Sequence, residues 1–149
     1  MARYIRQHCA NDLVIAPLAL GNHVDHISVH RAAVNCLSPQ TLAFYEDLPY
    51  VTWTPAADLQ ARVEYIARTT GTQLKPFILQ VQDAVERKRR IASFYQSQIT
   101  AEEADNIARY AETYGSGERL WIPAYSEDWK TIRRLATKPP QTAISCAPR

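Results

Sequence analysis

The fold of this 149-residue chain is decided by residues 13–26, Leu-Val-Ile-Ala-Pro-Leu-Ala-Leu-Gly-Asn-His-Val-Asp-His. The apolar run 13–16, ended by Pro17, predicts a strand buried on both faces, as in a parallel sheet. Gly21 allows a sharp turn before the next element. Apolar residues spaced three and four apart then predict a helix over about 26–37. A strand, a loop and a helix in this order are typical of an α/β layer fold.

The rest of the chain continues the alternation of strands and helices. Strands are predicted at 41–45 and 120–122. Helices are predicted at 2–9, after Thr54-Pro55, over 77–98, and after a Thr-x-x-Glu capping box at 100–103. Two or three strands are few for a self-sufficient parallel sheet. We expect one α/β domain over 1–137 and a flexible, proline-containing tail over 138–149.

Composition and charge argue against several classes of protein. Hydrophobic residues make up 46% of the chain and charged residues 21%, as in an ordinary packed domain. A net charge of +2 does not indicate nucleic acid or a membrane as partner. The basic run 87–90 favours a solvated helix face, with Lys88, close to the apolar stripe, placed either to snorkel to the surface or to pair with a carboxylate. No apolar run is long enough for a membrane span, and no signal peptide is evident. The three cysteines are scattered along the chain, which indicates a reducing compartment, so we expect a cytoplasmic protein.

His23, Asp25 and His26 follow the first predicted strand, at the place where open α/β sheets bind ligands. The two histidines are three residues apart, so a first helical turn would bring them together. Imidazole is a good zinc ligand, and a neighbouring carboxylate fixes its tautomer. His30, one turn further on, would add a third nitrogen to a self-contained metal cluster. The alternative is that these histidines are surface residues or satisfied polar groups of the core.

Two further groups of residues follow the second predicted strand. Tyr45, Tyr50 and Trp53 fit either stacking on a sugar or packing in a core or interface. Glu46 and Asp47 fit either binding of substrate hydroxyls or an exposed turn at the end of the strand. The sequence leaves both pairs of alternatives open.

An ordered set of segments runs along most of the chain. It comprises 16–26 (Ala-Pro-Leu-Ala-Leu-Gly-Asn-His-Val-Asp-His), 29–33 (Val-His-Arg-Ala-Ala), 44–50 (Phe-Tyr-Glu-Asp-Leu-Pro-Tyr), a helix pattern of Lys88, Ile91, Ala92, Tyr95, Ser97 and Gln98, and 118–121 (Glu-Arg-Leu-Trp). Together they resemble the C-terminal part of the PIG-L or LmbE-like family of zinc-dependent N-acetylglucosaminyl deacetylases. The resemblance implies a Rossmann-like, LmbE-type layered sheet, incomplete at its N-terminal side.

The resemblance also implies a role for each residue of the His-x-Asp-His string. His26 would bind zinc. His23 would polarise the amide carbonyl and stabilise the oxyanion, and Asp25 would orient His23. Amide hydrolysis needs such positive charge where the oxyanion develops.

The family's first signature, His-Pro-Asp-Asp, is absent from this sequence. In the family it supplies two further zinc ligands and the general base. Because catalytic zinc normally has three protein ligands, we expect a weak or incomplete zinc site in this chain alone.

Two functional hypotheses follow. The chain is a deacetylase, or a piece of one, that removes an N-acetyl group from an amino sugar or glycoconjugate, with the missing groups supplied by a second chain or an upstream segment. The expected protein partners are a homo-oligomer or a complementing chain. Alternatively, it is a truncated, non-catalytic member that acts as a binding or assembly module. In either case we expect an uncovered sheet edge and self-association.

Overall fold

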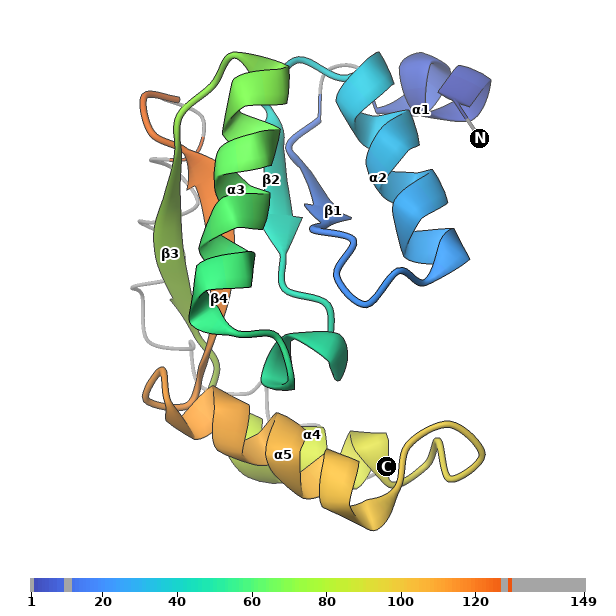
Figure 1. The fold of residues 1–149 in the computed structure, drawn as a ribbon, viewed down its shortest axis with the longest axis vertical. Coiled ribbons are helices and arrows are strands. Elements are labelled where there is room, and N and C mark those ends of the chain that lie inside the picture. Colours follow the sequence, from blue (N-terminus) through green and yellow to red (C-terminus); the bar gives the residue numbers. More distant parts are fainter. Residues whose placement is uncertain (1, 10–11, 127–128, 130–149) are drawn as a thin grey trace, which may run out of the picture.

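The computed structural model describes residues 2–9, 12–126 and 129 as a mixed α/β structure (Figure 1). In chain order its elements are α1 (Ala2–His8), β1 (Val14–Pro17), α2 (Val24–Cys36), β2 (Leu42–Tyr45), the 3-10 helix η1 (Tyr50–Thr52), α3 (Ala56–Thr70), β3 (Leu74–Gln80), α4 (Ala84–Ala92), α5 (Ala101–Glu112) and β4 (Gly117–Pro123). The α/β class is therefore confirmed. The predicted tail at 138–149 lies outside the described residues.

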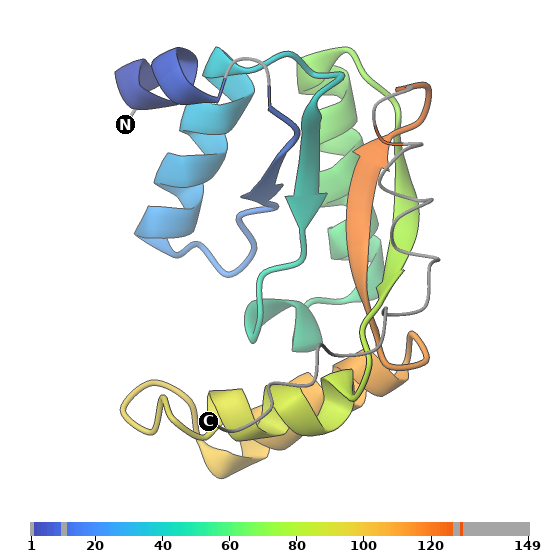
Figure 2. The ribbon, with the colours of Figure 1, turned by 180° about the vertical axis from the view of Figure 1, so that it is seen from behind.

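The sheet has the strand order β1-β2-β4-β3 and is mixed rather than wholly parallel. β1 and β2 run parallel, with Val14 opposite Leu42. β4 is antiparallel to β2 and also to β3, with which it pairs from Leu74 to Gln80. Figure 2 shows the sheet from the side opposite to α3, with the arrows of β1 and β2 pointing the same way, toward the end where α4 and α5 lie.

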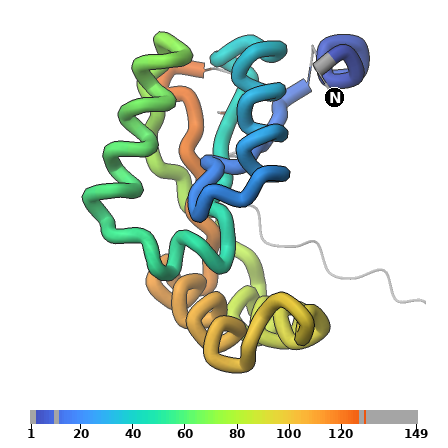
Figure 3. The backbone as a smooth tube through the Cα atoms, turned by 45° about the vertical axis from the view of Figure 1, so that its right-hand side comes forward, coloured from blue at the N-terminus to red at the C-terminus, as the bar shows by residue number. Residues whose placement is uncertain are grey.

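The main core lies between the sheet and the helices α2 and α3. Its buried residues include Leu18, Leu42, Phe44 and Ile66, each of which contributes about 1.5–3 kcal/mol when removed from water. In Figure 3, α2 and α3 stand on either side of the loop that follows β1, and α4 and α5 form a separate layer beyond the strand ends. This arrangement leaves the carboxyl ends of β1 and β2 facing the α4–α5 hairpin.

The predicted long helix over 77–98 is wrong. Residues Leu74–Gln80 form β3, and only Ala84–Ala92 form a helix in this region. Ile78 fits a helical stripe by spacing, but it pairs with Arg119 on the neighbouring strand. Asp83 then takes a left-handed conformation, with φ of 55°, and separates strand from helix. Long-range strand pairing has therefore overridden the local helical pattern.

Helix start signals are partly confirmed. Thr100 and Glu103 form the predicted capping box, with the Thr100 amide donating to Glu103 Oε2 at 2.6 Å and the Glu103 amide donating to Thr100 Oγ1 at 3.2 Å. Before α3, however, Pro55 is the N-cap, and the Thr54 hydroxyl donates to the Tyr50 carbonyl instead. Helix α2 begins two residues earlier than predicted, at Val24, and His23 is its N-cap.

β1 is an edge strand of the described sheet, because β2 is its only neighbour there. The side chain of Ile15 in its middle is 44% exposed. Such an edge offers backbone groups to another strand. The self-association expected from the sequence stays a prediction.

Within the part of the chain that the structure describes, no helix combines the length and apolar character needed to cross a membrane.

Candidate active site

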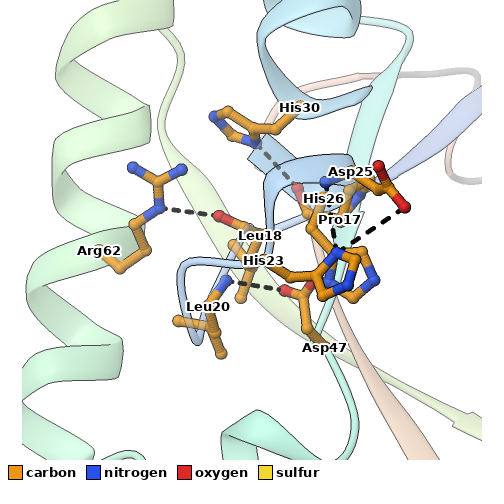
Figure 4. A network of polar contacts seen from close by, with 9 residues as sticks. All are labelled: Pro17, Leu18, Leu20, His23, Asp25, His26, His30, Asp47 and Arg62. Atoms are coloured by element: carbon orange, nitrogen blue, oxygen red, sulfur yellow. Dashed lines mark hydrogen bonds and ion pairs between the residues drawn. The ribbon is translucent and has the colours of Figure 1, made fainter. Parts of the chain in front are cut away.

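The loop between β1 and α2 has an unusual backbone that sets the direction of α2. Ala19, Gly21 and Asn22 all have positive φ, at 62°, 70° and 59°. At Gly21 a Cβ atom would lie 2.1 Å from Cδ1 of Tyr50, so a larger residue is excluded by conformation and by space. The turn predicted at Gly21 is confirmed. It places His23 at the helix start and His26 in the first turn (Figure 4).

His26 is backed by a buried carboxylate from the neighbouring strand end. Its Nδ1 lies 2.7 Å from Oδ1 of Asp47, close enough for an ion pair although the direction is poor for a hydrogen bond. The Asp47 side chain is fully buried, and its Oδ2 accepts a 3.1 Å hydrogen bond from the Leu20 amide. Burial raises the pKa of Asp47, while the Leu20 amide and the charge of His26 act in the opposite direction. A buried carboxylate therefore lies directly beside Nδ1 of His26.

In their neutral forms the two histidines would take opposite tautomers. With the Asp47 carboxylate beside Nδ1, a neutral His26 would carry its proton on Nδ1 and leave the Nε2 lone pair free. The Asp25 amide donates to Nδ1 of His23 at 3.3 Å, so a neutral His23 would carry its proton on Nε2. The ring centroids are 5.1 Å apart. One imidazole thus presents a metal ligand and the other a hydrogen-bond donor.

The Asp25 carboxylate contacts His23 only loosely. Its Oδ2 is 4.0 Å from Nδ1 of His23, and its side chain is 81% exposed. The Asp25 backbone amide, rather than its carboxylate, makes the closer contact with the ring. The orienting role expected for the Asp25 side chain stays a prediction.

An open groove of about 370 Å³ lies in front of the two histidines. We call it the histidine groove; its lining includes His23, His26, Leu48, Pro49, Tyr50, Trp53, Tyr95, Gln98, Ile99 and Glu103. Tyr50 and Trp53 come from η1 and the residue after it, and Tyr95 to Ile99 come from the connection between α4 and α5. Trp53 is 52% exposed and Tyr95 is 55% exposed. Tyr45 is not part of the groove, since it packs against a core cluster that contains Trp129.

His30 is not gathered with the other two histidines. It is buried, and its Nδ1 lies 2.8 Å from the carbonyl oxygen of Pro17. Burial lowers the pKa of this imidazole, which favours its neutral form. Among the described residues, no three His, Cys, Asp or Glu side chains form a group able to hold a metal ion. The three-histidine cluster therefore has no support from the geometry.

Of the two alternatives for Glu46 and Asp47, the exposed turn is wrong, because both side chains are buried. Glu46 Oε1 accepts hydrogen bonds from Arg119 Nε at 2.6 Å and Trp121 Nε1 at 2.8 Å, and its Oε2 accepts one from the Tyr110 hydroxyl. These bonds tie β2 to β4 and α5, so both oxygens of Glu46 are already engaged by the protein. The expected pairing of Lys88 is confirmed, with its Nζ 2.8 Å from Glu118 Oε1.

Asp47 is the residue that sequence reasoning missed as a partner of His26. It lies 21 positions away along the chain, so no local spacing links the two. The position of Asp47 just after β2 could have indicated this contact. β2 is the parallel neighbour of β1, and the carboxyl ends of adjacent parallel strands lie side by side.

The chain is similar to the 2'-N-acetylparomamine deacetylase of Streptomyces fradiae. The two are 34% identical over 138 residues, which covers 76% of this chain and 47% of that protein. The chain thus spans about half the length of the curated relative it matches. No family model matches the sequence. No solved structure matches it either.

Proposed function

We propose that this chain forms the His-x-Asp-His side of a PIG-L- or LmbE-type active site that removes an N-acetyl group from an amino sugar. The observation that carries the proposal is the His26–Asp47 pair, which leaves one nitrogen free beside a second histidine of opposite tautomer. The similarity to a protein named 2'-N-acetylparomamine deacetylase supports the same class of reaction.

The residues present fit zinc as a partial shell. His26 would hold the ion through Nε2, with Asp47 fixing the ring as carboxylates do behind many zinc histidines. Zinc, when bound, would lower the pKa of a water molecule and so supply the nucleophile. Since catalytic zinc normally has three protein ligands, the other ligands and the general base would come from a complementing segment or chain.

His23 would act on the oxygen of the amide. Its Nε2–H donor can hydrogen-bond the carbonyl oxygen and stabilise the negative charge that develops there. As the N-cap residue of α2, it also lies at the positive end of a helix dipole. If His23 first takes up a proton from solvent, which would displace the Asp25 amide from Nδ1, it could give its Nε2 proton to the leaving amine and so return to the neutral form. Asp25 would support the charged form of His23 from the surface.

The histidine groove would bind the sugar. Tyr50, Trp53 and Tyr95 offer aromatic faces on which a sugar ring can stack. Glu103 adds a carboxylate to the same lining, which can accept hydrogen bonds from sugar hydroxyls. The groove therefore suits a ring-shaped substrate that carries hydroxyl groups.

A zinc-binding experiment tests the assignment of the ligand. Zinc retained by the purified chain should fall when His26 is replaced by alanine, and should not fall in His8→Ala, a histidine of α1 outside the groove. Unchanged zinc in His26→Ala would refute the assignment.

A deacetylase assay tests the activity. Amine release from 2'-N-acetylparomamine and from N-acetylglucosamine should require both this chain and a complementing segment that carries the missing carboxylates. Full activity of the chain alone would show that the incomplete-site reasoning is wrong. Saturable sugar binding with no turnover under either condition would favour the binding-module alternative.

A further inference from the structure

A second cavity lies between α2 and α3, on the other side of the β1–α2 loop from the histidine groove. Its volume is about 510 Å³, and it shares no lining residue with the groove. We call it the arginine cavity; the residues that matter for its chemistry are Asn22, His30, Arg31, Arg62, Tyr65 and Thr69. None of these residues has a part in the proposed deacetylation.

Arg62 is held rigidly at the wall of the arginine cavity. Its Nε donates a 2.8 Å hydrogen bond to the Leu18 carbonyl (Figure 4). Its Cζ lies 5.5 Å from the centre of the Tyr65 ring. The two terminal nitrogens of this half-buried guanidinium have no hydrogen-bond or ion-pair partner among the described residues. Burial lowers the pKa of Arg62, while the more distant charges of Tyr65 and Asp47 act in the opposite direction without forming an ion pair with it.

The rest of the lining is cationic or neutral. Arg31 brings a second guanidinium, which makes no ion pair with any described residue. Burial lowers the pKa of His30, the contact with the Pro17 carbonyl raises it, and the charges of Arg62 and Arg31 lower it further, so both cations act on the same space. No Asp or Glu is present among the described residues that line the cavity.

We propose that the arginine cavity binds the oxyanion group of a small ligand, a phosphate or a carboxylate. A guanidinium anchored through Nε presents its two terminal nitrogens as a fork, which matches two oxygens of one anion. Arg31 adds charge from the opposite helix, and the Asn22 side chain adds a neutral donor. The anion would place a negative charge in direct contact with the guanidinium, which no carboxylate of the described cavity lining does. This inference does not depend on the proposed function.

Titration with inorganic phosphate, followed by amide chemical shifts at constant ionic strength, tests the proposal. Saturable shifts should map to the cavity, and Arg31→Gln should weaken binding by about tenfold or more, which corresponds to about 1.4 kcal/mol. Arg68→Gln is the matched control, because Arg68 lies on α3 but does not line the cavity. Arg62→Gln should weaken phosphate binding as well, and its amide spectrum checks that the variant folds. If Arg62→Gln does not fold, the result for Arg31→Gln decides.

A parallel titration with malonate distinguishes the two ligand chemistries. Saturable binding of phosphate alone assigns a phosphate group, and binding of malonate alone assigns a carboxylate. Absence of saturable binding for both anions would overturn the proposal. So would an equal loss of affinity in Arg31→Gln and Arg68→Gln, because the effect would then be one of general surface charge.

Discussion

Replacing Asp47 by asparagine should invert the tautomer of His26 without changing the shape of the site. The asparagine carbonyl can still accept the hydrogen bond from the Leu20 amide, now made at 3.1 Å. Its NH₂ group would then face Nδ1 of His26, where the carboxylate oxygen lies 2.7 Å away. An NH₂ donor requires a lone pair on Nδ1, so the imidazole proton must move to Nε2. The nitrogen proposed to bind zinc would lose its free lone pair.

The size of the effect follows from what Asp47 contacts. Loss of a carboxylate that fixes a metal-binding histidine costs about 10–100-fold in metal affinity, or about 1.4–2.7 kcal/mol. The free energy of unfolding should fall by about 1–3 kcal/mol, because one buried polar contact is altered while the other is kept. The variant should therefore fold but bind zinc much more weakly.

Two measurements check this expectation. Competition against a chromophoric chelator gives the zinc affinity, and ¹⁵N chemical shifts of the imidazole nitrogens give the tautomer without any metal. Asp25→Asn is the matched control, since its exposed carboxylate is 4.0 Å from His23 and should change zinc affinity by no more than about twofold. A zinc affinity and a His26 tautomer both unchanged in folded Asp47→Asn would refute the reasoning.

Three further changes test other parts of the structure. Gly21→Ala should lower the free energy of unfolding, measured with denaturant, by about 2–5 kcal/mol, because its φ is positive and its Cβ would clash with Tyr50. Gly71→Ala, where φ is 66° but no atom lies within 4 Å of the added Cβ, should lower it by about 1–2 kcal/mol. Glu46→Gln should lower the free energy of unfolding by about 2–4 kcal/mol, because the partly buried guanidinium of Arg119 loses its counter-charge. Asp105→Asn, which removes the exposed partner of Arg89, should lower it far less, and equal losses in the two variants would contradict the reasoning. Burial lowers the pKa of His30 below its usual 6.5, so the unfolded state binds a proton first on acidification. The free energy of unfolding should therefore keep its full value above about pH 6.5 and fall below that pH. If its pH dependence is the same in His30→Gln, His30 is not the cause of that fall.

Local signals predicted the part of the fold that forms the site. The strand, the turn at Gly21 and the following helix were all visible in residues 13–26, because each depends on residues close together in sequence. The capping box at 100–103 was visible for the same reason. What such signals missed was long-range pairing. β3 has apolar residues at helix-compatible spacing, and only its pairing with β4, about 40 residues away, makes it a strand.

The site followed the same rule. His23 and His26 could be placed together from their spacing, and the structure has them in contact. Asp47, by contrast, meets His26 through the parallel pairing of β1 and β2. The burial of Glu46 also depends on distant partners, Arg119 and Trp121, which no local pattern names.

The attachment of the α4–α5 hairpin has a consequence for local unfolding. One wall of the histidine groove belongs to this hairpin, and the Glu46–Tyr110 hydrogen bond is a main polar link between α5 and the sheet. A layer held at few points can open as a unit at a lower free energy than the whole domain. Native-state hydrogen exchange should then show the amides of α4 and α5 exchanging together, ahead of those of β2 and β4. A sugar bound in the groove would bridge the hairpin and η1, and so slow that exchange.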